Sequence, residues 1–135
     1  MQDFRKLRVW HESIELAAAV YEMTRRLPRS ERYGITAQVR GAAVSISSNI
    51  AEGCGRPSRK DFARFLGIAI GSASELESQL YIIARLGLLE DDHISVLVRR
   101  TAQCRKRLIA LYQSVGAAIS TQYPEPTTHY SLDGR

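Results

Sequence analysis

A glycine-rich stretch in the middle of the chain has residue types that could hold a phosphate group. The segment SSNIAEGCGRPSRKDF combines two glycines with three cations, namely Gly53, Gly55, Arg56, Arg59 and Lys60. A Walker-type phosphate loop follows a β-strand and reads GxxxxGK[ST], whereas this segment follows a helical pattern and continues RPSRKD. We therefore interpret it as the corner between two helices, with a cluster of cations at a helix N-terminus where an anion is favoured.

The same corner contains the residues that end one helix and start the next. Gly53 or Gly55 is expected to adopt the left-handed conformation that closes a helix, and Pro57 prevents its continuation. Ser58 and Asp61 resemble a capping box for the following helix.

Polar side chains follow one edge of the apolar stripe on both helices that meet at this corner. They are Gln38, Ser45, Asn49, Glu52, Ser72, Glu75 and Gln79. Antiparallel pairing of the two helices is expected to bring Gln38 close to Ser72 and Glu75. An active site would require a histidine in this seam, and the seam has none. We interpret it as a structural seam that fixes the register or the choice of partner, because buried polar groups must satisfy one another.

Metal and cysteine chemistry have little support in the sequence. A di-metal helical bundle needs two ExxH repeats on facing helices, but only Glu90 to His93 has this spacing, at a helix start. Cys54 and Cys104 form no CxxC pair and are expected about 20 Å apart along the bundle, too far for a disulfide. We expect reduced, buried thiols, and no metal, cofactor or catalytic residue.

A basic run in the last helical segment is the strongest binding signal. At about 100° per residue, Arg99 and Lys106 project directly away from the apolar stripe. Arg100 and Arg107 flank them on one side, while Arg105 points back to the stripe edge. With few acids expected nearby, this positive ribbon is either a solvated face or a surface that binds a polyanion.

Four amphipathic segments must position these residues. Apolar residues recur at helical spacing over residues 7–27, 35–52, 58–86 and 91–121. No half-buried strand pattern occurs, so we expect an all-α, antiparallel up-down four-helix bundle over residues 1–122. Residues 123–135, with two prolines and no apolar period, are expected to form a flexible C-terminal tail.

Composition and patterning also suggest an assembly. The chain has 135 residues, 44% hydrophobic and 24% charged, with a net charge of +5 that permits a polyanionic partner. It has no apolar run of membrane-spanning length and no signal-peptide pattern, so we expect a cytoplasmic protein. On the first helix, the row from Trp10 to Tyr21 lies beside a second apolar row from Val9 to Leu27. This double stripe predicts self-association.

Three stretches of the chain are similar to a known family. FRKLRVWHESIELAAAVYEMTRRLP, SERYGITAQVRGAAVSISSNIAEG and FARFLGIAIGSASELESQLYIIARLG, within about residues 4–88, resemble the "four helix bundle" or 23S rRNA intervening-sequence protein family. The motif positions are Trp10, Gln38, Ser45, Asn49, Glu52, Gly53, Ser72 and Glu75. The resemblance implies a homo-oligomeric ring, with a pentamer as the expected form, and gives no catalytic residue. It extends to accessory proteins of diversity-generating retroelements, basic rings that engage nucleic acid and a reverse transcriptase.

Two functions follow from these observations. In the first, the chain is a non-enzymatic ring whose basic surface binds RNA or DNA without strong sequence preference. The contacts to phosphate would come from two patches, namely Arg99, Arg100, Lys106 and Arg107, and Arg56, Arg59 and Lys60. In the alternative, it is a structural adaptor that binds another protein through its longer helices or its tail. An enzyme would require a deep, ligand-holding pocket in the polar seam.

Overall fold

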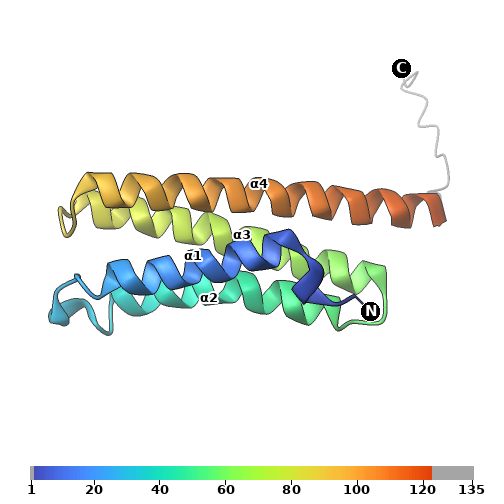
Figure 1. Ribbon diagram of the computed structural model, residues 1–135, viewed down its shortest axis with the longest axis horizontal. Coiled ribbons are helices and arrows are strands. Elements are labelled where there is room, and N and C mark those ends of the chain that lie inside the picture. The colour runs from blue at the N-terminus through green and yellow to red at the C-terminus, as the bar shows by residue number, and fades with distance from the viewer. Residues whose placement is uncertain (1, 123–135) are drawn as a thin grey trace, which may run out of the picture.

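The computed structural model describes residues 2–122 of the chain, with side chains through residue 119, so the tail predicted for residues 123–135 lies outside the described residues. Four α-helices lie side by side and alternate in direction (Figure 1). They are α1 (Arg8–Thr24), α2 (Ile35–Cys54), α3 (Arg59–Arg85) and α4 (Asp91–Gln122), with short 3-10 helices η1 (Phe4–Lys6) and η2 (Arg29–Glu31). This confirms the predicted antiparallel four-helix bundle.

The first helix ends earlier than its apolar pattern, which continues to residue 27. Proline has no N–H, so Pro28 cannot donate a hydrogen bond to the carbonyl of Thr24, where α1 stops. The amide of Leu27 donates to that carbonyl instead, at 3.1 Å, in a tight turn. Proline therefore shortens the helix by a turn rather than ending it at the preceding residue.

The corner between α2 and α3 is built differently from the prediction. Ser58 caps α3 as expected, because its hydroxyl accepts a hydrogen bond from the amide of Asp61 at 3.1 Å. The expectation of a left-handed glycine here was wrong: Gly53 lies within α2, and Gly55 is right-handed with φ −79°. The left-handed glycine is Gly87, with φ +67°, which closes α3.

Gly53 serves close packing instead. A Cβ atom at this position would lie 2.8 Å from the Cβ of Phe65 and 3.0 Å from the ring of Phe62. Ordinary carbon contacts are no closer than about 3.5 Å, so only glycine allows α2 and α3 to approach this closely at the corner. The glycine is therefore required by the neighbouring helix rather than by its own backbone angles.

The core fills the space between the four helices with aliphatic side chains. Its largest fully buried hydrophobic members are Leu16, Val20, Val39, Ile46, Ile50, Leu66, Leu76, Leu80, Ile83 and Leu108. Of the two apolar rows on α1, the one that contains Leu16 and Val20 is buried. In the other row Ile14 and Tyr21 remain about 40% exposed. The bundle thus buries one row and leaves part of the second on its surface, while Trp10 and Ala17 of the second row pack against the core.

None of the helices within residues 2–122 is both long enough and apolar enough to cross a membrane.

Candidate nucleic-acid interface

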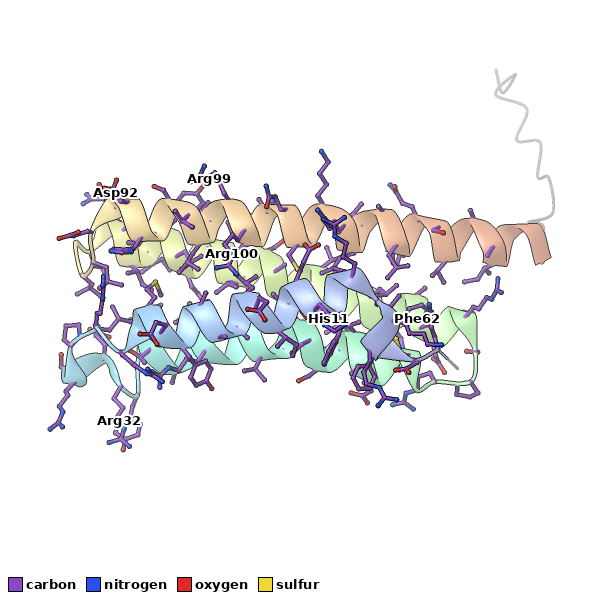
Figure 2. The ribbon with its side chains drawn as sticks, in the orientation of Figure 1. His11, Arg32, Phe62, Asp92, Arg99 and Arg100 are labelled. Carbon is purple, nitrogen blue, oxygen red and sulfur yellow. The ribbon has the colours of Figure 1, made fainter. Side chains whose placement is uncertain are left out.

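The side chains of the predicted basic ribbon on α4 point in two different directions. Arg99 points away from the bundle, whereas Arg100 points into the space between α4 and α1 (Figure 2). Lys106 is exposed like Arg99, and Arg100 is half-buried. None of these three cations forms an ion pair with another described residue. They are free to interact with an external anion.

Two other cations of the ribbon have acidic partners from neighbouring helices. Arg107 Nη1 lies 2.6 Å from Glu12 Oε1 on α1, and Arg105 is paired with Glu77 on α3. The expectation that few acids lie nearby was therefore wrong for this part of α4, because helix packing brings carboxylates that are distant in sequence. The available positive charge lies at Arg99, Arg100 and Lys106 rather than along the whole ribbon.

A groove of about 390 Å³ separates α1 from α4 at this level. Its walls carry charged groups from both helices, namely Arg8, Glu12, Glu15, Arg100 and Arg107, together with His11, Leu16 and Gln103. The sequence interpretation did not include Arg8 and His11. The signal that could have identified them is their position on the edge of the first helix, beside the apolar stripe that packs in the core.

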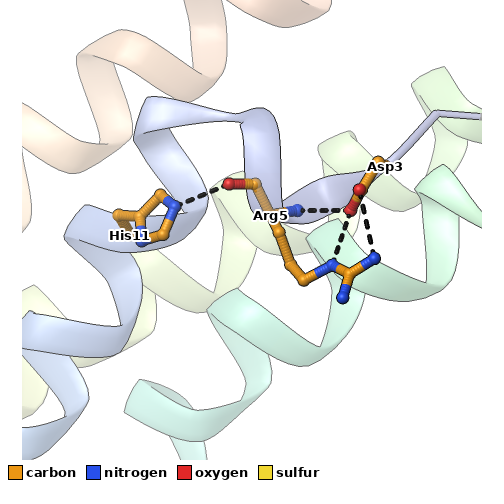
Figure 3. Close-up of polar contacts among 3 residues, drawn as sticks. All are labelled: Asp3, Arg5 and His11. Atoms are coloured by element: carbon orange, nitrogen blue, oxygen red, sulfur yellow. Dashed lines mark hydrogen bonds and ion pairs between the residues drawn. The ribbon is translucent and has the colours of Figure 1, made fainter.

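The N-terminal segment fixes the histidine of this groove. His11 Nε2 lies 2.7 Å from the carbonyl oxygen of Arg5, so this nitrogen carries the proton that is donated (Figure 3). Arg5 is itself held by Asp3, whose carboxylate accepts bonds of 3.0 and 3.2 Å from the guanidinium. Hydrogen bonds from the side chain and the backbone amide of Arg5 lower the pKa of Asp3.

The second predicted patch, at the corner, also contains both paired and unpaired cations. Arg56 is paired with Glu52 at 3.0 Å and covers the ring of Phe65 at 4.9 Å from the ring centre. Arg59 and Lys60 are exposed and have no ion pair with a described residue. The corner therefore offers two available cations at the start of α3, while Arg56 has a structural role on the corner surface.

A recess of about 480 Å³ lies between this corner and the second half of α4. Its apolar wall is formed by Phe62 of α3 and by Leu111, Val115 and Ala118 of α4. Glu12 near the start of α1 faces Arg107, and α1 begins only four residues before Glu12. Because α4 continues well beyond residue 107, its last turns have no α1 beside them.

The polar seam is connected over its central part. The hydroxyls of Ser45 and Ser72 lie 2.8 Å apart and join α2 to α3. The amide of Asn49 donates to the carbonyl and hydroxyl oxygens of Ser45 at 2.8 and 2.9 Å. Gln79 donates to Glu75 at 3.2 Å along α3. The bonds among Ser45, Asn49 and Ser72 satisfy a half-buried set of polar groups between the two helices.

The ends of the predicted seam lie elsewhere. With Ser45 opposite Ser72, antiparallel pairing places Gln38 level with Gln79, two turns away from Ser72, so the expected proximity of Gln38 to Ser72 was wrong. Gln38 is exposed, and Glu52 turns to Arg56 at the corner. The buried Oε1 atom of Gln79 has no hydrogen-bond partner among the described residues.

Both cysteines are free and buried, as predicted. Burial, followed by the negative charge of Glu12, raises the pKa of Cys104 to about 11. Burial, followed by the charge of Asp3, also raises the pKa of Cys54. Neither thiol is activated as a nucleophile, because only the thiolate is reactive. Within residues 2–122, no three His, Cys, Asp or Glu side chains are grouped as metal ligands would be.

Comparisons with known proteins agree with this architecture. A family model described as 23S rRNA-intervening sequence protein matches residues 5–110. The fold is similar to that of a protein with unknown function from the S23 ribosomal protein family of Bacteroides thetaiotaomicron, with a TM-score of 0.72 and 25% sequence identity. The similarity covers 77% of this chain and 97% of that one. No curated protein matches the sequence.

Proposed function

Because the chain belongs to the 23S rRNA-intervening sequence protein family and presents unpaired cations on α4, we propose that it is a non-enzymatic, cytoplasmic protein that binds nucleic acid. The observation that carries this proposal is that Arg99, Arg100 and Lys106 have no acidic partner among the described residues. Lysine and arginine contacts to phosphate release condensed counterions and supply affinity for any sequence. The protein therefore binds RNA or DNA with little sequence preference.

The corner supplies a second contact region. Arg59 and Lys60 lie at the start of α3, where the backbone amides of the first turn add to the positive potential. Arg56 supports this region from the corner surface, although its guanidinium is shared with Glu52 and Phe65. Two separate cationic regions on one bundle allow a chain of phosphates to be held at more than one point.

Self-association of the bundle is the second part of the proposal. Arg40 on α2 contacts both Thr24 and the ring of Tyr21 on α1, and Val44 lies one turn further along α2. Together with Ile14, these side chains leave apolar surface on the outer face of α1 and α2. A second copy would cover it, and repetition of this contact around an axis gives a ring, for which five subunits is the proposed number.

Charge reversal on α4 tests the nucleic-acid part. In fluorescence anisotropy with labelled duplex DNA and RNA, the affinity of the wild type should fall steeply as salt rises. The double variant Arg99→Glu/Lys106→Glu should bind at least about tenfold more weakly at low salt. The control Arg26→Glu/Arg85→Glu makes the same change in net charge with two exposed cations elsewhere, and should have a much smaller effect. Equal losses in both variants, or no binding at low salt, would contradict the proposal.

Light scattering on the purified protein tests the assembly. The proposed ring has the mass of five chains at micromolar concentration. The variant Ile14→Glu places a charge on the exposed row of α1 and should dissociate the ring without unfolding the bundle, because Ile14 is outside the core. A wild-type protein that remains a single chain at these concentrations would exclude the ring.

A structural adaptor is the second candidate, and the recess beside α4 favours it. Its apolar wall of Leu111, Val115 and Ala118 has no partner helix from α1, and Arg59 lies on its rim. A protein segment with apolar and acidic side chains fits this surface. A pull-down that recovers the same protein before and after nuclease treatment, and loses it with Val115→Asp, would favour the adaptor.

A further inference from the structure

One carboxylate in the α1–α4 groove is shared by two guanidinium groups. Glu12 Oε1 lies 2.6 Å from Arg107 Nη1 on α4 and 3.3 Å from Arg8 Nε one turn earlier on α1. Neither contact has the alignment of a hydrogen bond, so both are ionic. The chain thus supplies its own anion at a point where two cations converge.

Burial gives this contact more weight than a typical surface ion pair has. The side chain of Glu12 is 29% exposed, and its Oε1 atom is closed off from solvent. Charges in such a position are screened less by water and salt than charges on an open surface. The pair therefore competes with external anions for Arg107, whose side chain is 40% exposed, over a range of ionic strength.

The other charged groups of the groove determine which contacts a phosphate could make if Glu12 were removed. Arg100 and His11 lie on its walls without an acidic partner among the described residues, and Glu15 is the other acid. A phosphate that entered beside Arg100 would compete with the carboxylate of Glu12 for Arg107. A phosphate oxyanion and a carboxylate compete for the same guanidinium donors.

We propose that Glu12 is a built-in competitor of phosphate, which occupies Arg107 and limits how tightly nucleic acid binds in the α1–α4 groove. This inference rests on the proposed nucleic-acid binding and adds a regulatory residue to it. Arg99, Arg100 and Lys106 make the phosphate contacts of the wild type, and Arg107 becomes a further contact only when Glu12 is displaced or removed. A partner or a modification that withdrew Glu12 would increase the affinity.

The variant Glu12→Gln tests this role against a closely matched control, Glu15→Gln. Both changes remove one negative charge from the same groove, but Glu15 forms no ion pair with a described residue. In anisotropy titrations with duplex DNA, we expect Glu12→Gln to bind about three- to tenfold more tightly than Glu15→Gln at low salt. We also expect its plot of log affinity against log salt to be steeper by about 0.9, the contribution of one additional phosphate contact. The slope for Glu15→Gln should match that of the wild type.

A second substitution identifies the cation involved. Combined with Glu12→Gln, the change Arg107→Gln restores the net charge of the wild type and should return both the affinity and the slope to those of the wild type. If the wild type binds but Glu12→Gln and Glu15→Gln have equal affinities and slopes, the role of Glu12 is overturned and the proposed function stands. If neither the wild type nor any variant binds at low salt, the proposed function fails together with this inference.

Discussion

The bundle has two contrasting helix interfaces. Between α2 and α3 the backbones approach so closely that Gly53 has no room for a Cβ, and the polar bridge between them consists of neutral hydroxyls, Ser45 and Ser72. Between α1 and α4 the helices leave a groove of about 390 Å³, lined largely by charged side chains. The link across this groove is an ion pair between Glu12 and Arg107.

The contrast separates residues that hold the fold from residues available for binding. Close packing and neutral hydrogen bonds fix a register and leave little to exchange with a ligand. The half-buried ion pair in the groove can be exchanged for contacts with an external anion, because a phosphate can accept from the same guanidinium. Substitutions at the α2–α3 interface should therefore change stability, and those at the α1–α4 groove should mainly change binding.

The largest effect is expected at Gly53. The variant Gly53→Ala would place a Cβ 2.8 Å from that of Phe65, so the corner must open, and the free energy of unfolding should fall by about 3 kcal/mol. Gly71→Ala is the control, because its Cβ would meet nothing within 4 Å. In urea denaturation it should raise stability by about 0.5–1 kcal/mol, the usual gain from glycine to alanine in a helix. Equal effects of the two variants would refute the tight α2–α3 contact.

A smaller effect is expected from Cys104, which borders the charges of the α1–α4 interface. Its pKa of about 11 in the folded protein lies above the ordinary value of 9.0, so the unfolded chain loses the proton first as pH rises. The stabilising contribution is complete below about pH 9 and declines between about pH 9 and 11.

Urea denaturation at about pH 8 and about pH 10.5 measures this contribution. Over this step the wild type should lose about 2 kcal/mol more stability than Cys104→Ala, which has no thiol at this position and keeps Cys54. Parallel losses in the two proteins would show that the thiol is not shielded. That result would mean that the α1–α4 interface is more open to solvent than its groove alone indicates.

The smallest effect is expected for the hydroxyl bridge. The hydroxyl of Ser45 accepts from the amide of Asn49 and shares a second hydrogen bond with the hydroxyl of Ser72. Ser72→Ala should lower the free energy of unfolding by about 1 kcal/mol. A double-mutant cycle with Ser45→Ala isolates the energy of the bridge itself, which should be below about 1 kcal/mol. A coupling near zero would mean that the register depends on apolar packing alone.

Much of the fold could be predicted because local signals in the sequence agree with one another. Helical apolar spacing, Pro28, and Ser58 with Asp61 placed four helices and their boundaries to within a few residues. The exception is instructive: Gly53 and Gly87 look alike in sequence, but the first is required by a neighbouring helix and the second by its own backbone. The residue type predicts where a turn lies, but it does not show whether the glycine is needed for its backbone angles or for close packing.

The candidate site was less predictable, because charge partners come from helices that are distant in sequence. The spacing on α4 correctly separated Arg99 from Arg105, since one projects outward and the other lies at the edge of the stripe. It could not show that Glu12 of α1 would lie against Arg107. Such pairs depend on the axial register of two helices, and one sequence alone does not fix that register.

The two buried thiols give the protein a pair of internal probes. Cys54 lies at the end of α2 beside the corner, and Cys104 lies in the middle of α4. Because burial raises the pKa of both, an alkylating reagent modifies them mainly when the surrounding structure transiently opens. The two labelling rates thus separate fraying at one end of the molecule from rupture of its centre, without any introduced cysteine.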